Sequence, residues 1–187
     1  MVASQWSPFT TGLDHTPEQP VPFSHKHHVG ELGLDCRYCH ASVEDTAFAG
    51  MPSTHICMTC HSQLFTNVPM LAPVRESLAD GRPLIWNRVN QLPDYVYFDH
   101  SIHIAKGVGC AECHGAVHDM PLMRQAQPLS MGWCLSCHRD PGPHLRAQNA
   151  ITDTTFVADN SPQQAAALMK AYDIHPAHLT DCSVCHR

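Results

Sequence analysis

Every cysteine of the chain lies in one repeated pattern, in which two residues separate a pair of cysteines and a histidine follows at once. This CxxCH pattern occurs five times in 187 residues and uses all ten cysteines. CxxCH is the attachment sequence for c-type haem, where each thiol forms a thioether and the adjacent histidine ligates the iron. The motifs predict five covalently attached haem c groups. The thioether cysteines are Cys36, Cys39, Cys57, Cys60, Cys110, Cys113, Cys134, Cys137, Cys182 and Cys185, and the proximal iron ligands are His40, His61, His114, His138 and His186.

Zinc ribbons are the main alternative for the same cysteines. The first four pairs give C-x2-C-x17-C-x2-C and C-x2-C-x20-C-x2-C, spacings that can place four thiolates around one zinc ion. A ribbon does not need a histidine after each pair, and the fifth pair has no partner. Histidine makes up 16 of 187 residues, so its chance occurrence after all five pairs is on the order of a few in a million, whereas haem attachment requires it. Disulfides leave these histidines unexplained, and no βαβ pattern indicates thioredoxin-like chemistry.

Composition and charge exclude some partners. The chain has 11 Lys and Arg against 17 Asp and Glu, a formal charge of −6. This balance argues against nucleic acid, whose binding needs a basic surface. No run of eighteen apolar residues is present, so we expect no transmembrane helix in this chain. The first residues also lack the features of a signal peptide, although CxxCH haem attachment occurs outside the cytoplasm and requires export.

A second motif supplies further histidines. F-x-H-x-x-H occurs at residues 23–28 and 98–103, and each copy precedes a pair of CxxCH motifs. Two copies of so particular an order predict duplicated dihaem modules. Histidines three residues apart lie about one helical turn apart and can reach different haems. We therefore expect His25, His28, His100 and His103 to be distal iron ligands.

The elements that position these residues are predicted to be short. We expect a mainly irregular fold with short α-helices, about one at each CxxCH, in which the haems form most of the core. Residues 73–80 before Gly81, and residues 162–172 after Ser161, have the start and stop signals of helices, whereas Pro93 predicts an extended loop at 83–98. The expected divisions are an extended N-terminal arm (1–22), a first dihaem module (23–72), a linker (73–97), a second dihaem module (98–145), and a C-terminal helix with the fifth haem site (146–187).

The F-x-H-x-x-H runs before CxxCH resemble those of the class III multihaem cytochromes c. In that family the second histidine of the run ligates the haem attached just downstream, and the first reaches a neighbouring haem. The resemblance also implies a distal histidine soon after a CxxCH motif. It thus assigns His28 to haem one, His25 to haem two, His103 to haem three, His100 to haem four and His118 to haem five.

Methionine offers another distal ligand near the fourth motif. Met120, Met123 and Met131 lie in residues 120–134, and of these we favour Met131. A His/Met pair would raise the haem potential relative to two histidines. The alternative is that these thioethers pack against haem edges as flexible hydrophobic groups.

A closer resemblance covers almost the whole chain from Phe23. The segments WNRVNQLPDYVYFDHSIHIAKGVGCAECHG (86–115), MRQAQPLSMGWCLSCHR (123–139) and DCSVCHR (181–187) are similar to the pentahaem cytochrome c subunits of alternative complex III. This resemblance implies an electron-transfer subunit, not an enzyme by itself, on the periplasmic face of the bacterial cytoplasmic membrane. Its partners would be an iron–sulfur subunit, a quinol-oxidising membrane subunit and a monohaem cytochrome c. The family's subunit usually begins with a membrane-spanning helix, so either an anchor precedes this chain or a partner holds it.

Two other functions are compatible with five CxxCH motifs. One is a free periplasmic electron carrier; Trp86, Tyr95 and Tyr97 favour a docked subunit over it, because aromatic side chains suit interface cores. The other is a multihaem reductase of small oxyanions, which needs an open or lysine-ligated iron. Every motif here ends in histidine, which argues against it.

Overall fold

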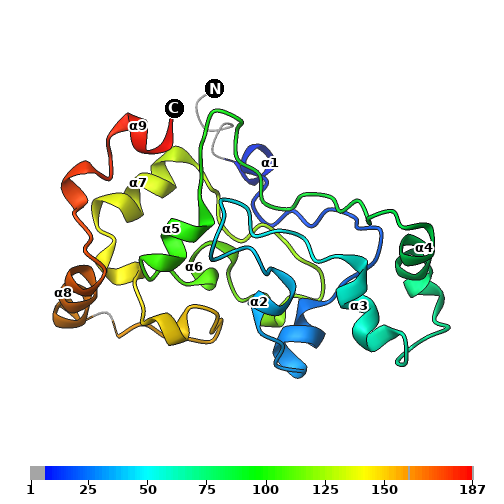
Figure 1. Cartoon of the computed structure of the whole chain (residues 1–187). Coiled ribbons are helices and arrows are strands. Elements are labelled where there is room, and N and C mark those ends of the chain that lie inside the picture. The colour runs from blue at the N-terminus through cyan, green and yellow to red at the C-terminus, as the bar shows by residue number, and fades with distance from the viewer. Residues whose placement is uncertain (1–6, 160, 187) are drawn as a thin grey trace.

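Short helices joined by irregular segments make up the structure (Figure 1), a computed structural model that describes residues 7–159 and 161–186. The α-helices are α1 (Pro8–Thr11), α2 (Cys36–Cys39), α3 (Thr54–His61), α4 (Ala72–Asp80), α5 (His100–Ala105), α6 (Cys110–His114), α7 (Met131–Arg139), α8 (Pro162–Ala171) and α9 (Cys182–Cys185). A π-helical turn spans Lys26–Glu31, and 3-10 turns lie at Pro69–Leu71, Val117–Asp119, Gly142–His144, Gln148–Ala150 and Pro176–His178. In the described residues, strand pairing is limited to one antiparallel bridge between Val108 and Leu145. The predicted loop-rich fold of short helices is confirmed.

The two helices predicted outside the haem motifs form where their end signals lie. Helix α4 has a proline in its first turn and ends at Gly81, whose φ of 65° is the left-handed conformation that glycine adopts without strain. At the start of α8 the Ser161 side chain accepts a hydrogen bond from the backbone N–H of Gln164. Residues 83–98 are irregular, as Pro93 predicts.

The helices of residues 54–80 and the helices of the last third of the chain lie at opposite ends of the molecule (Figure 1). Helices α3 and α4 lie at one end, α7, α8 and α9 at the opposite end, and α2, α5 and α6 between them. Residues 13–22 run alongside the segment after α4, where the Gln19 side chain makes two hydrogen bonds with the backbone of Asn87, at 2.8 and 2.9 Å. The segment predicted as an extended arm also contains α1, while its residues 1–6 lie outside the described part.

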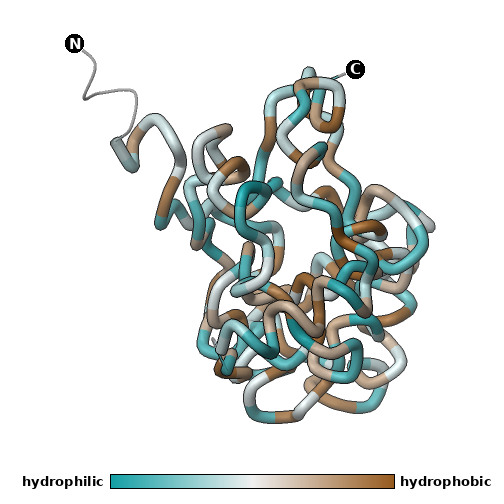
Figure 2. The backbone as a smooth tube through the Cα atoms, turned by 90° about the vertical axis from the view of Figure 1, so that its left-hand side faces the viewer, coloured by the Kyte–Doolittle hydropathy of each residue, from teal (hydrophilic) through white to brown (hydrophobic). Residues whose placement is uncertain are grey.

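Apolar side chains of the chain itself form only a small core. The buried cluster consists of Val43, Ile104 and Ile151, with Ala49 and Cys110 packed against it. Hydrophobic residues are otherwise scattered along the backbone (Figure 2), and Phe9, Phe48 and Ile85 are among many that are largely exposed. A chain of this length with so small an apolar core needs apolar surface from another source, which is what covalently bound macrocycles provide.

Candidate haem-binding sites

Each CxxCH motif begins in a short helix, as predicted. Sites one to five, numbered by the order of their motifs, lie at α2, α3, α6, α7 and α9 (Figure 1). Side-chain caps fix the start of two of them: Asp35 accepts a hydrogen bond from the N–H of Arg37 at α2, and Ser130 from that of Trp133 at α7. All ten cysteines are free thiols. Both sulfurs of each motif are therefore available for thioether bonds.

The histidine of each motif is oriented through its Nδ1 atom. In four sites Nδ1 lies within hydrogen-bonding distance of a backbone carbonyl: Gly50 for His40 (2.7 Å), Leu64 for His61 (3.2 Å), Leu179 for His138 (2.8 Å) and Tyr95 for His186 (3.0 Å). A carbonyl can only accept, so Nδ1 carries the proton and Nε2 keeps its lone pair. This is the tautomer that ligates a metal through Nε2, with the carbonyl fixing the ring.

At site three Asn90 takes the place of the carbonyl. Its Nδ2 lies 3.1 Å from Nδ1 of His114, while its buried Oδ1 has no hydrogen-bond partner in the described part of the chain. Turning the amide by 180° places Oδ1 where it accepts from the Nδ1–H of His114 and leaves no acceptor unpaired. Asn90 thus sets the same tautomer at His114 as the carbonyls set elsewhere.

The two F-x-H-x-x-H runs repeat one local arrangement. Phe23 contacts His25 edge-on (4.9 Å between centroids) and stacks on His28 (4.3 Å). Phe98 does the same with His100 (4.7 Å) and His103 (4.6 Å). The second histidine of each run donates from Nδ1 to the carbonyl four residues earlier, at 2.9 Å for His28 and 2.6 Å for His103. Because one imidazole of each run is edge-on to the phenylalanine and the other is stacked on it, the two imidazoles point in different directions.

Three of these four imidazoles face the histidine of a CxxCH motif. The ring centroids are 6.2 Å apart for His28 and His61, 6.4 Å for His100 and His114, and 6.1 Å for His103 and His138. With a metal–nitrogen bond of about 2.0 Å, as in zinc–histidine sites, and a ring centroid about 1.1 Å beyond the nitrogen, two imidazoles on opposite sides of one metal have centroids about 6.2 Å apart. The residues present therefore fit a six-coordinate haem iron held between two histidines.

The pairs differ from those that the resemblance to class III cytochromes implies. His28 faces the histidine of site two rather than site one, His100 faces that of site three, and His103 that of site four. His25 faces no motif histidine among the ring contacts of the described residues, and burial lowers its pKa, with the charges of His40 and His28 adding to the effect. In the three facing pairs His100 meets the motif just downstream, and His28 and His103 meet the motif after that, which is a different order from the one that the resemblance implies.

Burial keeps several of these imidazoles neutral. It lowers the pKa of His25 and that of His114 to about 4, with the charges of neighbouring histidines adding to the effect. Burial also lowers the pKa of His28 and of His103. Because only the neutral imidazole ligates a metal, these residues are ready to bind iron at neutral pH without first losing a proton.

His118 does not lie against site five. Its Nδ1 is 2.9 Å from Oγ1 of Thr154 and its Nε2 is 3.5 Å from the Asp119 carboxylate. A Cβ added to Gly30 would collide with the carbonyl of His118, so the residue lies beside the first F-x-H-x-x-H run. In the described residues no contact joins His118 to His186, whose ring packs near that of Tyr95 at 5.8 Å.

Met131 does not occupy the position that faces the histidine of site four. His103 already occupies the position opposite His138, and Met131 is 66% exposed at the start of α7. Its neighbour in sequence Trp133 is half-buried.

Sequence reasoning missed the residues that orient the motif histidines. Asn90 and the carbonyls of Leu179 and Tyr95 lie 24, 41 and 91 residues from the rings they contact. Backbone carbonyls carry no sequence signal at all. Asn90 has the only side chain among them, in a linker that shows no motif.

Two comparisons with known proteins bear on these sites. The family model for cytochrome c3 matches residues 102–187, which include three CxxCH motifs. The chain is also 31% identical over 182 residues to the menaquinone reductase, multiheme cytochrome c subunit, of Nitratidesulfovibrio vulgaris (strain Hildenborough). That match covers 97% of this chain and 73% of the relative. No helix of the described residues is long and apolar enough to cross a membrane.

Proposed function

The chain belongs to the multihaem cytochrome c family, and from this premise we propose that it binds five haem c groups and relays electrons within a membrane-bound quinone-linked complex. Haem iron supplies reversible one-electron transfer, while the protein sets position and potential. The main support is the set of three imidazole pairs with centroids 6.1–6.4 Å apart. Two histidines fill both axial positions of an iron, which suits electron transfer rather than catalysis on a bound substrate.

The facing rings support the proposed ligands of sites two, three and four, and His25 is proposed for site one as the remaining histidine of the first run. Cys36 and Cys39, Cys57 and Cys60, Cys110 and Cys113, Cys134 and Cys137, and Cys182 and Cys185 form the thioethers, with His40, His61, His114, His138 and His186 as proximal ligands. His25, His28, His100 and His103 are the distal ligands of sites one, two, three and four, in that order. Hydrogen bonds from Nδ1 to backbone carbonyls orient His28, His100, His103 and four of the motif histidines and raise their basicity. His114 contacts Asn90 instead, and the buried Nδ1 of His25 has no partner in the described residues.

We place this subunit in an alternative complex III type of assembly on the periplasmic face of the cytoplasmic membrane. The proposed partners are an iron–sulfur subunit, a quinol-oxidising membrane subunit and a monohaem cytochrome c. Tyr95 and Tyr97, beside site five, are 67% and 54% exposed, which favours a docked subunit over a free carrier because tyrosine is enriched at interfaces. Trp86, expected to be exposed with them, is instead half-buried.

A second candidate is electron flow in the opposite direction, into menaquinone. The relative named as a menaquinone reductase subunit supports it. The two directions share the same sites and differ in the complex that surrounds them.

The test is purification of the holoprotein with its native partners, followed by mass spectrometry and steady-state assays. The proposal expects a mass of the polypeptide plus five haems, low-spin ferric spectra at most sites, and co-purification with a quinone-reactive membrane subunit. Reduction of the haems by quinol supports quinol oxidation, and menaquinone-dependent reoxidation of pre-reduced haems supports the reductase. A monomer with five haems and no partner would contradict membership of a complex, and fewer than five haems would contradict the cofactor assignment.

A further inference from the structure

We propose that the five haem sites form a single unbranched line in the order two, one, three, four, five, so that the first site in sequence is the second in space. This order rests on the proposed function, because it needs haem at every motif. It assigns sites two and five as the two ends at which partners exchange electrons with this subunit. Sequence order alone would place site one at an end.

Sites two and one meet through the residues inside their CxxC loops. The hydroxyl of Tyr38, between the cysteines of site one, lies 3.0 Å from that of Thr59, between the cysteines of site two. His25 and His28 approach the two sites from the same helical turn.

Site one contacts site three. We call this contact, which joins the first half of the chain to the second, the crossing. The carbonyl of Ile151 accepts a hydrogen bond from the N–H of Cys110 (3.0 Å), and the next carbonyl, of Thr152, lies 4.0 Å from Sγ of Cys36. Two consecutive peptide groups therefore hold the first cysteine of each site.

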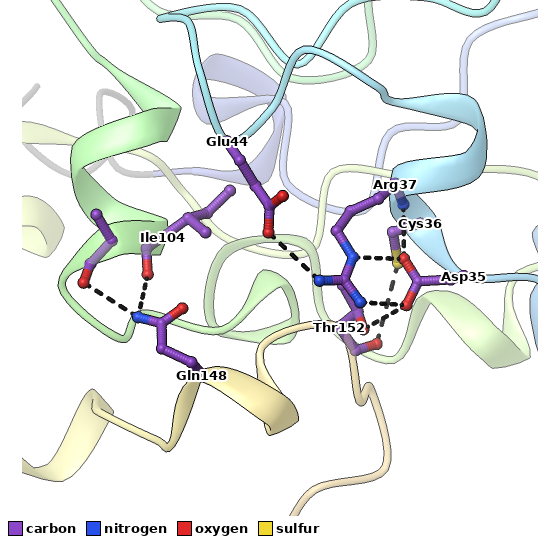
Figure 3. A network of polar contacts seen from close by, with 8 residues as sticks. Asp35, Cys36, Arg37, Glu44, Ile104, Gln148 and Thr152 are labelled. Atoms are coloured by element: carbon purple, nitrogen blue, oxygen red, sulfur yellow. Dashed lines mark hydrogen bonds and ion pairs between the residues drawn. The ribbon is translucent and has the colours of Figure 1, made fainter.

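Polar contacts fix this crossing (Figure 3). The Thr152 hydroxyl donates to the Asp35 carboxylate at 2.8 Å, and Arg37 binds the same carboxylate at 2.8 Å through Nε. From the other side, Nδ1 of His100 donates to the carbonyl of Ala47 at 2.7 Å. Residues far apart in sequence thus hold the cysteines of site one close to those of site three.

Sites three, four and five continue the line towards the C-terminus. Both distal histidines of this half are on helix α5. His100 faces His114 of site three, and His103 faces His138 of site four. Site four meets site five where His138 donates from Nδ1 to the carbonyl of Leu179 in the segment leading to α9.

The ends of the line share no contacts with distant sites. In the described residues no hydrogen bond or ring contact joins the motif or facing histidine of site two to those of sites three, four or five. Helix α3 of site two and helix α9 of site five lie at opposite ends of the molecule (Figure 1). A cyclic order would need contacts between these ends, and a branched order would need one site with three neighbouring sites.

The test uses the full-length holoprotein. The reduction potential of each site is measured by NMR during a redox titration. His28→Met marks site two and His100→Met marks site three, because a His/Met pair raises the potential so that the marked haem is reduced early. The electron on the marked haem adds a negative charge. This charge lowers the apparent potential of adjacent haems more than that of distant ones, since the interaction falls with distance. The matched control is His27→Met, an exposed neighbour of His28.

The expected result is that His28→Met lowers the potential at site one alone, that His100→Met lowers it at sites one and four, and that His27→Met changes none. An equal shift at sites one and four in His28→Met, or no shift at site one in His100→Met, would overturn the order. Where a variant does not load five haems, iron–iron distances in an experimental map of the wild-type holoprotein decide: sites two and three must be the nearest neighbours of site one. The haem count by mass spectrometry separates this outcome from failure of the proposed function, which would show fewer than five haems.

Discussion

Replacing His28 by alanine is expected to change the spin state of site two and not of site one. His28 faces His61 with centroids 6.2 Å apart, stacks on Phe23, and donates from Nδ1 to the carbonyl of Ser24. Its removal takes one axial ligand from one haem of five, so about one fifth of the ferric iron should become high-spin. Loss of the hydrogen bond, about 1 kcal/mol, and of the ring contact, about 1 kcal/mol, leaves a folded protein whose haems are still covalently attached.

Electron paramagnetic resonance of the ferric protein measures the high-spin fraction, and a second substitution identifies the haem. Adding Cys57→Ala and Cys60→Ala removes site two, and the high-spin signal of His28→Ala should disappear with it. Adding Cys36→Ala and Cys39→Ala instead removes site one and should leave the signal in place. His27→Ala is the matched control and should remain low-spin throughout. The opposite result, in which the signal depends on site one, would refute the assignment read from the facing rings.

Three further predictions concern the packing around sites one and three. Gly109→Ala should destabilise the protein by about 1–3 kcal/mol, measured by denaturant unfolding, because a Cβ there would collide with the guanidinium of Arg146. Arg146→Met should cost about 1.5–3 kcal/mol in the same assay, since it removes the buried guanidinium 2.7 Å from the Glu112 carboxylate and leaves that carboxylate with only its contact to His144 among the described residues; Lys170→Met, an exposed change, is the control. Asp35→Asn should flatten the acid side of the stability curve: Arg37 lowers the pKa of Asp35 from 3.8 to about 2, so its contribution is present above pH 3.8 and is lost as the pH falls towards 2. An acid-unfolding curve of Asp35→Asn identical to wild type would contradict this.

The sequence predicts best those features that a few neighbouring residues determine. CxxCH specifies its own chemistry within five residues, and Pro, Ser and Gly mark the ends of α4 and α8 because capping is local. F-x-H-x-x-H likewise predicts two imidazoles that diverge from one turn. All of these rest on bonds within one segment.

Local sequence patterns do not predict which CxxCH motif each of those imidazoles faces. His100 is held by the carbonyl of Ala47, 53 residues away, and His138 by that of Leu179, 41 residues away. Such contacts depend on the path of the whole chain and leave no pattern in composition or spacing. The facing rings pair the histidines of these runs with other motifs than the resemblance to class III cytochromes implies, and the ligand assignments stay predictions.

The histidine pairings make Met131 a candidate ligand of site five rather than of site four. With His103 opposite His138, site four has two imidazoles, whereas in the described residues the ring nearest His186 is that of Tyr95. Met131 lies one helical turn before Cys134, on the same face of α7, and α7 lies against the segment before site five, where Nδ1 of His138 donates to the carbonyl of Leu179. We therefore expect the Met131 thioether to ligate the iron of site five.

A His/Met pair at site five would give it a higher potential than sites with two histidines. Near-infrared magnetic circular dichroism of the ferric holoprotein should then show one His/Met charge-transfer band. Met131→Leu, which keeps the apolar volume, should abolish the band and turn one haem of five high-spin, while Met123→Leu, a matched change nearby, should keep it. If the wild-type spectrum has no such band, the thioether packs beside the haem without ligating it, and the sixth ligand of site five comes from elsewhere.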